Sequence, residues 1–269
     1  MSTSEYLTRP EGRIAYDLQG DGPLVVCLPG MGDLRTTYRF LVPALVDAGY
    51  RVATLDLRGH GDSDATFSSY DDEALASDAI ALIEELGGSA CVVGNSMGGA
   101  AAAIVAANRP DLVDGLVLLG AFLREPQVGR FMTILTRILM WPPWARTMWK
   151  AYLPKLYAGT KPSDFEAYRD SMIEAMKAPG KTRAFSQTTK TSHAPVEARL
   201  PQVKAPALTV MGTLDPDFPD PKAEAEWIAA SIGGDILMVD GVGHYPQSQA
   251  PEIVNPAIVE FVRGLRSDA

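Results

Sequence analysis

The chain has 269 residues, of which 46% are hydrophobic and 21% are charged, and its 24 basic and 33 acidic residues leave a formal net charge of −9. These values fit one large or two small globular domains and exclude a disordered, collagen-like or coiled-coil chain. The acidic balance disfavours nucleic acid and anionic lipid as partners, because both carry negative charge. We therefore expect no nucleic acid and no membrane among its partners.

Two features bear on the cellular compartment. The two cysteines, Cys27 and Cys91, lie in apolar runs, which predicts reduced thiols in the core rather than a disulfide framework. Residues 1–22 contain no apolar stretch of the signal-peptide type, and no uncharged apolar run reaches the ~18 residues that span a bilayer. The sequence thus predicts a cytoplasmic protein.

In chain order, short apolar runs alternate with helical patterns. Glu5–Leu7 and Arg13–Asp17 predict an antiparallel hairpin at a sheet edge. The later runs lack alternation, which is typical of parallel strands buried on both faces; they are Leu24–Leu28, Tyr50–Leu55, Ala90–Val93, Leu112–Leu119, Ala207–Met211 and Asp235–Val239. Helical patterns separate several of them, at Tyr38–Ala48, Glu73–Leu86 and Gly98–Asn108. This order predicts an α/β fold with a mostly parallel sheet.

The alternation stops between about Leu123 and Leu200. This stretch is rich in Met and holds three of the four tryptophans, and four prolines are expected to break it into short helices: Pro142, Pro143, Pro154 and Pro162. We predict a helical cap, residues 123–199, inserted into a core made of residues 1–122 and 200–269.

The strongest chemical signal is Gly94-Asn95-Ser96-Met97-Gly98, directly after an apolar strand and before a run of alanines. A G-x-S-x-G sequence in this context is typical of a nucleophile elbow, in which a strained turn presents the serine. Side chains at Gly94 and Gly98 would collide with neighbouring backbone. The sequence therefore predicts Ser96 as a nucleophile.

A serine hydroxyl needs a base and an acid that orients the base. With such an elbow, acid and histidine follow the serine in the chain, so His60 is not favoured. His193 comes before the last two predicted strands, whereas His244 lies in the loop after the last one and is the expected base. Asp215 is the preferred acid because it lies nearest to the end of its strand. Asp217 is the second candidate and Asp220 the third.

The oxyanion of a tetrahedral intermediate needs N–H donors. The backbone N–H groups of Met97, which follows the nucleophile, and of Met31, in a glycine-rich loop after an early strand, are the expected donors. The segment Asp56–Ser63 has Asp, Arg and Ser side chains that are expected to pin a loop beside the site. Neither a metal-ligand pattern nor a dinucleotide-binding fingerprint is present, so we expect no metal and no cofactor.

These motifs resemble those of the α/β-hydrolase superfamily over nearly the whole chain: LPGMGD, DLRGHGDS, GNSMGG, MGTLD and GVGHYPQSQAPE occur in that order. The resemblance implies an α/β-hydrolase fold, a sheet of about eight strands with helices on both faces and an inserted cap. It also implies nucleophile, acid and base roles for Ser96, Asp215 and His244. Many relatives have His-Gly where this chain has Pro29-Gly30. Dehalogenases and epoxide hydrolases of the superfamily use an Asp nucleophile, and position 96 is Ser.

The resulting hypothesis is a serine hydrolase that cleaves a small or medium carboxylic ester or lactone through an acyl-enzyme. Perhydrolase (haloperoxidase-like) and C–C bond hydrolase activities use a similar triad and remain alternatives, as does a ligand-binding receptor or scaffold. The expected partner is a small molecule, bound by Gly30, Trp141, Trp144 and His193. The oligomeric state stays open between a monomer and a homodimer.

Overall fold

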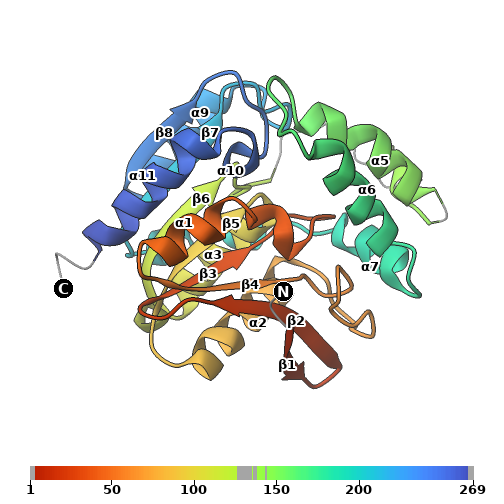
Figure 1. Cartoon of the computed structure of the whole chain (residues 1–269), viewed down its shortest axis with the longest axis horizontal. Coiled ribbons are helices and arrows are strands. Elements are labelled where there is room, and N and C mark those ends of the chain that lie inside the picture. Colours follow the sequence, from red (N-terminus) through yellow and green to blue (C-terminus); the bar gives the residue numbers. More distant parts are fainter. Residues whose placement is uncertain (1–3, 126–134, 136–137, 143, 266–269) are drawn as a thin grey trace.

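An eight-stranded sheet forms the centre of the molecule (Figure 1) in a computed structural model that describes residues 4–125, 135, 138–142 and 144–265. The strand order is β1-β2-β4-β3-β5-β6-β7-β8. The strands are β1 Glu5–Arg9, β2 Gly12–Gln19, β3 Leu24–Leu28, β4 Arg51–Leu55, β5 Ala90–Asn95, β6 Val113–Leu119, β7 Ala207–Gly212 and β8 Asp235–Val239. The α/β class and the sheet of about eight strands are confirmed.

Strand pairing explains the two kinds of sequence pattern. β1 and β2 form an antiparallel hairpin, as predicted, and β2 joins it to the rest of the sheet by pairing antiparallel with β4. The pairs from β4 to β8 along the sheet are all parallel. Every residue of β3, β5 and β7 is buried, which fits their continuous apolar runs.

β8 differs from the other parallel strands. Asp235 and Ile236 are exposed, and only Val239 of the strand is fully buried. The expectation of burial on both faces is therefore wrong for this strand, because β8 is the last strand at its edge of the sheet and has one neighbour instead of two.

Helices cover both faces of the sheet (Figure 1). α1 (Leu41–Asp47) and α11 (Pro251–Gly264) contact each other and pack on one face, against a cluster that contains Val25 and Val52. The other face is covered by α2 (Asp72–Leu86), α3 (Met97–Asn108) and α9 (Pro221–Ile232). Short helices complete the core: η1 Arg35–Tyr38, η2 Pro110–Leu112, η3 Leu200–Gln202 and α10 Pro246–Gln249.

The labelled cap helices lie beside the sheet, on the right of Figure 1, in colours from green to turquoise. The cap helices are α5 Ala145–Leu156, α6 Phe165–Ala175, α7 Lys181–Thr188 and α8 Ala194–Glu197, all within residues 123–199, and the boundaries of the cap stay a prediction. α5 to α7 share an apolar cluster with Tyr245 of the core. The prediction that Pro154 breaks a helix is wrong. Pro154 lies inside the last turn of α5. Pro143 lies outside the described residues.

Two further observations bear on the sequence predictions. Cys27 and Cys91 are both free and buried, as expected of core thiols. None of the helices in the described ranges is long and apolar enough to cross a membrane.

Candidate active site

Ser96 lies at a sharp turn between β5 and α3. Its backbone has φ 56° and ψ −121°, and Ser96 is the one non-glycine residue in the described part of the chain with positive φ. A Cβ at Gly94 would come within 2.2 Å of the Gly98 carbonyl oxygen, and a Cβ at Gly98 within 2.0 Å of the Leu28 carbonyl oxygen. The turn therefore requires both glycines, and its strain is the kind that functional sites retain.

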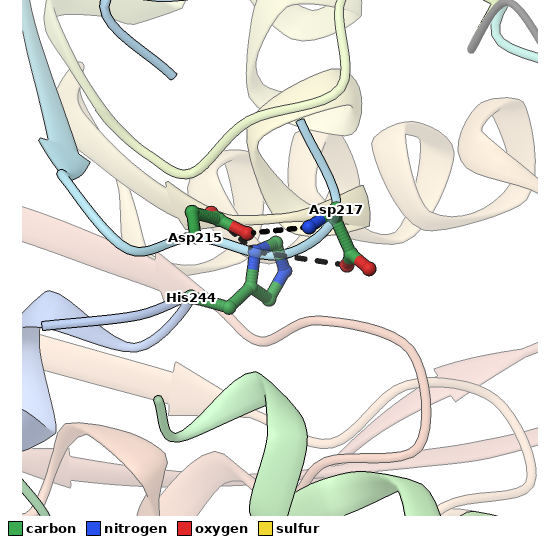
Figure 2. Close-up of side chains that lie close together, drawn as sticks. All are labelled: Asp215, Asp217 and His244. Carbon is green, nitrogen blue, oxygen red and sulfur yellow. Dashed lines mark hydrogen bonds and ion pairs between the residues drawn. The ribbon is translucent and has the colours of Figure 1, made fainter. Parts of the chain in front are cut away.

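His244 and Asp215 form a buried pair at the carboxyl ends of neighbouring strands. Asp215 follows β7 and His244 follows β8. The imidazole Nδ1 lies 2.7 Å from Asp215 Oδ2, and both side chains are almost fully buried (Figure 2). In the neutral form of the ring, with the proton on Nδ1 donated to the carboxylate, Nε2 keeps a lone pair.

The side chain of Asn95 connects the serine turn to the His244 loop. Its Nδ2 donates to the Leu119 carbonyl at 2.9 Å and to the His244 carbonyl at 3.1 Å. The Ser96 N–H also donates to the Leu119 carbonyl, at 2.9 Å. These bonds hold the turn, the end of β6 and the histidine loop against one another.

Gly120 packs against the His244–Asp215 pair. Its φ is 51°, and a Cβ at this position would lie 3.1 Å from both His244 Nδ1 and Asp215 Oδ2. Beyond it, the Phe122 ring lies 5.9 Å from the His244 ring. The pair is thus enclosed by backbone and apolar rings, which raises the strength of its electrostatic interaction.

Acidic neighbours control the charge of His244. Burial alone lowers its pKa, but the charge and hydrogen bond of Asp215, followed by the charges of Asp217 and Asp33, outweigh burial and raise the pKa to about 9. The imidazolium form is therefore strongly favoured here. Stabilisation of this cation is what a general base requires while it holds a proton taken from serine.

The loop after β3 passes close to Ser96. A Cβ at Gly30 would lie 3.0 Å from Ser96 Cβ, so this loop runs directly against the serine. Within the described residues, neither the Met31 N–H nor the Met97 N–H donates a hydrogen bond to the protein. The Met97 N–H also belongs to the first turn of α3, where free donors and the helix dipole favour an anion.

His60 bonds to the same loop. Its Nε2 accepts a hydrogen bond from the Gly32 N–H at 3.2 Å, and its Nδ1 donates to the Arg58 carbonyl at 3.0 Å. Burial lowers the pKa of His60 to about 4, which keeps Nε2 an acceptor at neutral pH. An imidazole from a distant loop thus contacts the segment in which this chain has Pro29 rather than histidine.

The predicted pinning of Asp56–Ser63 is also present. Asp56 accepts hydrogen bonds from the backbone N–H groups of Arg35 at 2.8 Å and Asp62 at 2.9 Å. Ser63 Oγ donates to the Asp56 carbonyl at 2.9 Å. The Arg58 side chain, in contrast, forms an ion pair outside the loop, with 2.7 Å between its Nε and Asp78 Oδ2 of α2.

Cap side chains bond directly to the loops of the site. Trp149 Nε1 donates to the Gly32 carbonyl at 3.2 Å. The Tyr168 hydroxyl donates to Asp33 Oδ1 at 2.5 Å, and the Tyr152 hydroxyl donates to Asp217 Oδ1 at 2.7 Å. The seating of α5 and α6 therefore depends on the same loops that hold Met31 and Asp215.

Within the described residues, no hydrogen bond, ion pair or ring contact joins Trp141, Trp144 or His193 directly to Ser96, Asp215 or His244. Trp141 and Trp144 contact each other edge to face and are exposed, by 59% and 40%. His193 is buried, with Nδ1 2.7 Å from Asp72 Oδ2, and the Phe122 ring stacks on it. A substrate role for these three residues and for Gly30 stays a prediction.

In the part of the chain that the structure describes, Asp215, Asp217 and His244 form one group that could hold a cation, since their ligand atoms lie within 4.8 Å of one another. The hydrogen bond between His244 and Asp215 accounts for this spacing, because a protonated Nδ1 is a donor and not a ligand. Asp220, the third acid candidate, instead caps α9 by accepting from the Ala223 N–H at 3.0 Å. The expectation of no metal stays a prediction.

Comparison with known proteins finds one family, together with relatives and solved structures that resemble this chain. The model of the alpha/beta hydrolase family matches residues 25–257. The AB hydrolase superfamily protein YfhM of Bacillus subtilis is 27% identical over 267 residues, which cover 90% of this chain and 91% of YfhM. Two solved structures share the fold. An esterase, EaEST, from Exiguobacterium antarcticum has a TM-score of 0.84 and 21% identity, and the match covers 97% of this chain and 100% of that one. The enol-lactonase from Burkholderia xenovorans LB400 has a TM-score of 0.82 and 21% identity, and the match covers 96% of this chain and 100% of that one.

Proposed function

The chain belongs to the alpha/beta hydrolase family, and from this premise we propose that it is a serine hydrolase that cleaves small or medium carboxylic esters or lactones through an acyl-enzyme. The observation that carries the proposal is the buried pair of His244 and Asp215, 2.7 Å apart, beside the strained turn at Ser96. An esterase and an enol-lactonase share this fold, so the fold is compatible with this class of substrate.

In the proposed mechanism, Ser96 Oγ attacks the substrate carbonyl carbon while His244 Nε2 takes its proton. The Met31 and Met97 N–H groups stabilise the oxyanion of the tetrahedral intermediate. His244 then protonates the leaving alkoxide, and the acyl group remains on Ser96. A water molecule that gives its proton to His244 hydrolyses this acyl-enzyme, and Asp215 keeps the imidazole oriented throughout.

The experiment is labelling with a fluorophosphonate, followed by intact-mass analysis and peptide mapping. We expect one adduct, on Ser96, and its loss in Ser96→Ala and His244→Ala, because only an activated serine reacts with this reagent. Both variants are expected to lose hydrolysis of short p-nitrophenyl esters by a factor of about 10³ or more. Near-full hydrolysis by either variant would exclude the mechanism.

A substrate panel then separates the alternatives. Multiple turnovers on esters or lactones support the proposal. Peracid formation from a carboxylic acid and hydrogen peroxide, or cleavage of a β-diketone without ester hydrolysis, would identify the perhydrolase or the C–C bond hydrolase instead. Tight ligand binding with less than one turnover per protein would identify a receptor.

A further inference from the structure

A second carboxylate lies beside the His244–Asp215 pair. Asp217 Oδ2 is 3.8 Å from His244 Nδ1, and the Asp217 side chain is 20% exposed (Figure 2). The Asp217 N–H donates to Asp215 Oδ1 at 3.0 Å, so the backbone of Asp217 also helps to hold Asp215. The imidazole is thus close to two acids rather than one.

Asp217 is held by the cap. The Tyr152 hydroxyl, on α5, donates to Asp217 Oδ1 at 2.7 Å, which leaves Oδ2 on the side of His244. One turn earlier on α5, Trp149 donates to the Gly32 carbonyl in the loop of Met31. A single cap helix therefore contacts both the acid loop and the proposed oxyanion loop.

The surroundings of His244 define which groups can change its charge. Asp215 and Asp217 reach it from the loop between β7 and α9, and Asp33 acts on it from the loop after β3. Uncharged groups of the described residues also lie beside the ring: the Gly120 backbone and the aromatic rings of Phe122, Phe218 and Tyr245. Tyr152 does not bond to His244, and it acts on the imidazole through Asp217.

We propose that Asp217 is a positioning residue that gives His244 a second carboxylate, and that Tyr152 holds this carboxylate in place, so that the seating of the cap sets the basicity of the imidazole. The proposal rests on the proposed function only in taking His244 as the base. Asp215 remains the acid that bonds to Nδ1, since it lies 1.1 Å closer (3.8 Å − 2.7 Å).

Two effects on hydrolysis follow. A second negative charge stabilises the imidazolium that forms when Ser96 loses its proton, which favours the attack step. The same charge keeps the resting imidazole protonated to higher pH, so the rising limb of activity with pH is displaced towards alkaline pH. The pKa of Asp217 itself is raised, mainly by burial and also by the charge of Asp215, while the charge of His244 and the Tyr152 hydrogen bond act in the opposite direction and favour the charged carboxylate.

The first test is NMR titration of the imidazole Cε1–H signals in the intact protein, which requires no substrate. The chain has three histidines, and His60→Gln and His193→Gln assign the other two signals. In Asp217→Asn we expect the His244 midpoint to fall by about one pH unit or more, the usual effect of losing an opposite charge at this distance. In Tyr152→Phe we expect a smaller fall, and in Asp217→Glu a partial return to the wild-type midpoint.

Asp220→Asn is the matched control, because it removes one negative charge from the same loop and an asparagine still caps α9. It should leave the His244 midpoint unchanged. The second test is the pH profile of kcat/KM for ester hydrolysis, in which the rising limb of Asp217→Asn should move to lower pH by the same amount as the NMR midpoint.

Each outcome decides between roles. An Asp217→Asn protein with a lowered melting temperature and an unmoved His244 midpoint would overturn the proposal, since Asp217 would then only fasten the cap. An unmoved midpoint in Tyr152→Phe would overturn the link to the cap. A shifted NMR midpoint in a protein that hydrolyses no ester would support the proposal while contradicting the proposed function, so the two fail separately.

Discussion

The absence of a Cβ atom at Gly120 leaves the space in which His244 and Asp215 lie together. The left-handed backbone of Gly120 turns the chain after β6 past the pair, and the absence of a side chain leaves the room that both partners need. The Asn95 amide is similarly specific, because one Nδ2 group bonds two carbonyls from segments 24 and 149 residues away. At this scale the site depends on contacts of one or two atoms, and it tolerates little displacement.

We therefore predict that Gly120→Ala lowers ester hydrolysis by about tenfold or more, because its Cβ would lie 3.1 Å from both His244 Nδ1 and Asp215 Oδ2. The measurement is kcat/KM with the rate of fluorophosphonate labelling. Gly241→Ala is the control, since Gly241 also has positive φ (70°) but no atom lies within 4 Å of an added Cβ. It should lose stability and keep activity. Equal activity losses in both variants would mean that backbone strain alone is responsible.

Among the described cap helices, α5 contacts two loops of the site. Its side chains at Trp149 and Tyr152 bond to loops that follow β3 and β7, and the indole packs against Gly32, whose Cβ would lie 2.6 Å from it. α6 adds Tyr168 on Asp33. The cap helices are thus joined to the core through the loops that hold the proposed catalytic groups.

Trp149→Phe should lower kcat about three- to tenfold, because the lost hydrogen bond to the Gly32 carbonyl is worth about 1 kcal/mol and frees the loop of Met31. Steady-state kinetics on a short ester provide the measurement. Trp227→Phe is the control, since Trp227 lies on α9 with Arg124 over its ring. If both variants lose activity equally, the effect comes from general loosening of the fold and not from the loop.

At the scale of the whole molecule, two histidines make opposite contributions to stability. The pKa of His244 is raised to about 9, so its contribution is complete below its ordinary value of 6.5 and is lost as the pH rises through 9. The pKa of His60 is lowered to about 4. The unfolded chain therefore binds a proton at this histidine below pH 6.5, whereas the folded protein binds it only below about pH 4. His60 therefore destabilises the fold as the pH falls through this window. Buried Asp33 and Asp56, whose pKa is raised by burial, act in the opposite direction.

A comparison with His60→Gln isolates this effect. Wild type should lose about 3 kcal/mol more than the variant from its unfolding free energy between pH 6.5 and pH 4, which is the shift from 6.5 to about 4 expressed as free energy. Urea unfolding at a series of pH values provides the measurement. Parallel curves for the two proteins would show that His60 takes up its proton in the folded state at an ordinary pH.

Local patterns in the sequence determined the strands, the hairpin and the serine turn. Continuous apolar runs predict strands buried on both faces, and for β3 and β8 the predicted bounds coincide with those of the structure. The expected edge hairpin is also present, and here Pro10 and Gly12 mark the turn between its strands. Gly94, Ser96 and Gly98 lie within five residues, so their spacing marks the turn in the sequence, although the atom that excludes a side chain at Gly98 is the Leu28 carbonyl oxygen of a distant strand.

Tertiary structure alone decided the rest. The sequence ranked Asp215 before Asp217 by nearness to a strand, but their separate distances to His244 arise only when the loops after β7 and β8 meet. Asn95, Gly120, His60 and Tyr152 gave no signal of their contacts, because each acts on residues far away in the chain. The exposure of β8 depends on its place at the sheet edge, and Pro154 remains helical within a cap helix whose inner face is buried. Local propensity specifies elements, whereas the sites between elements are specified by packing.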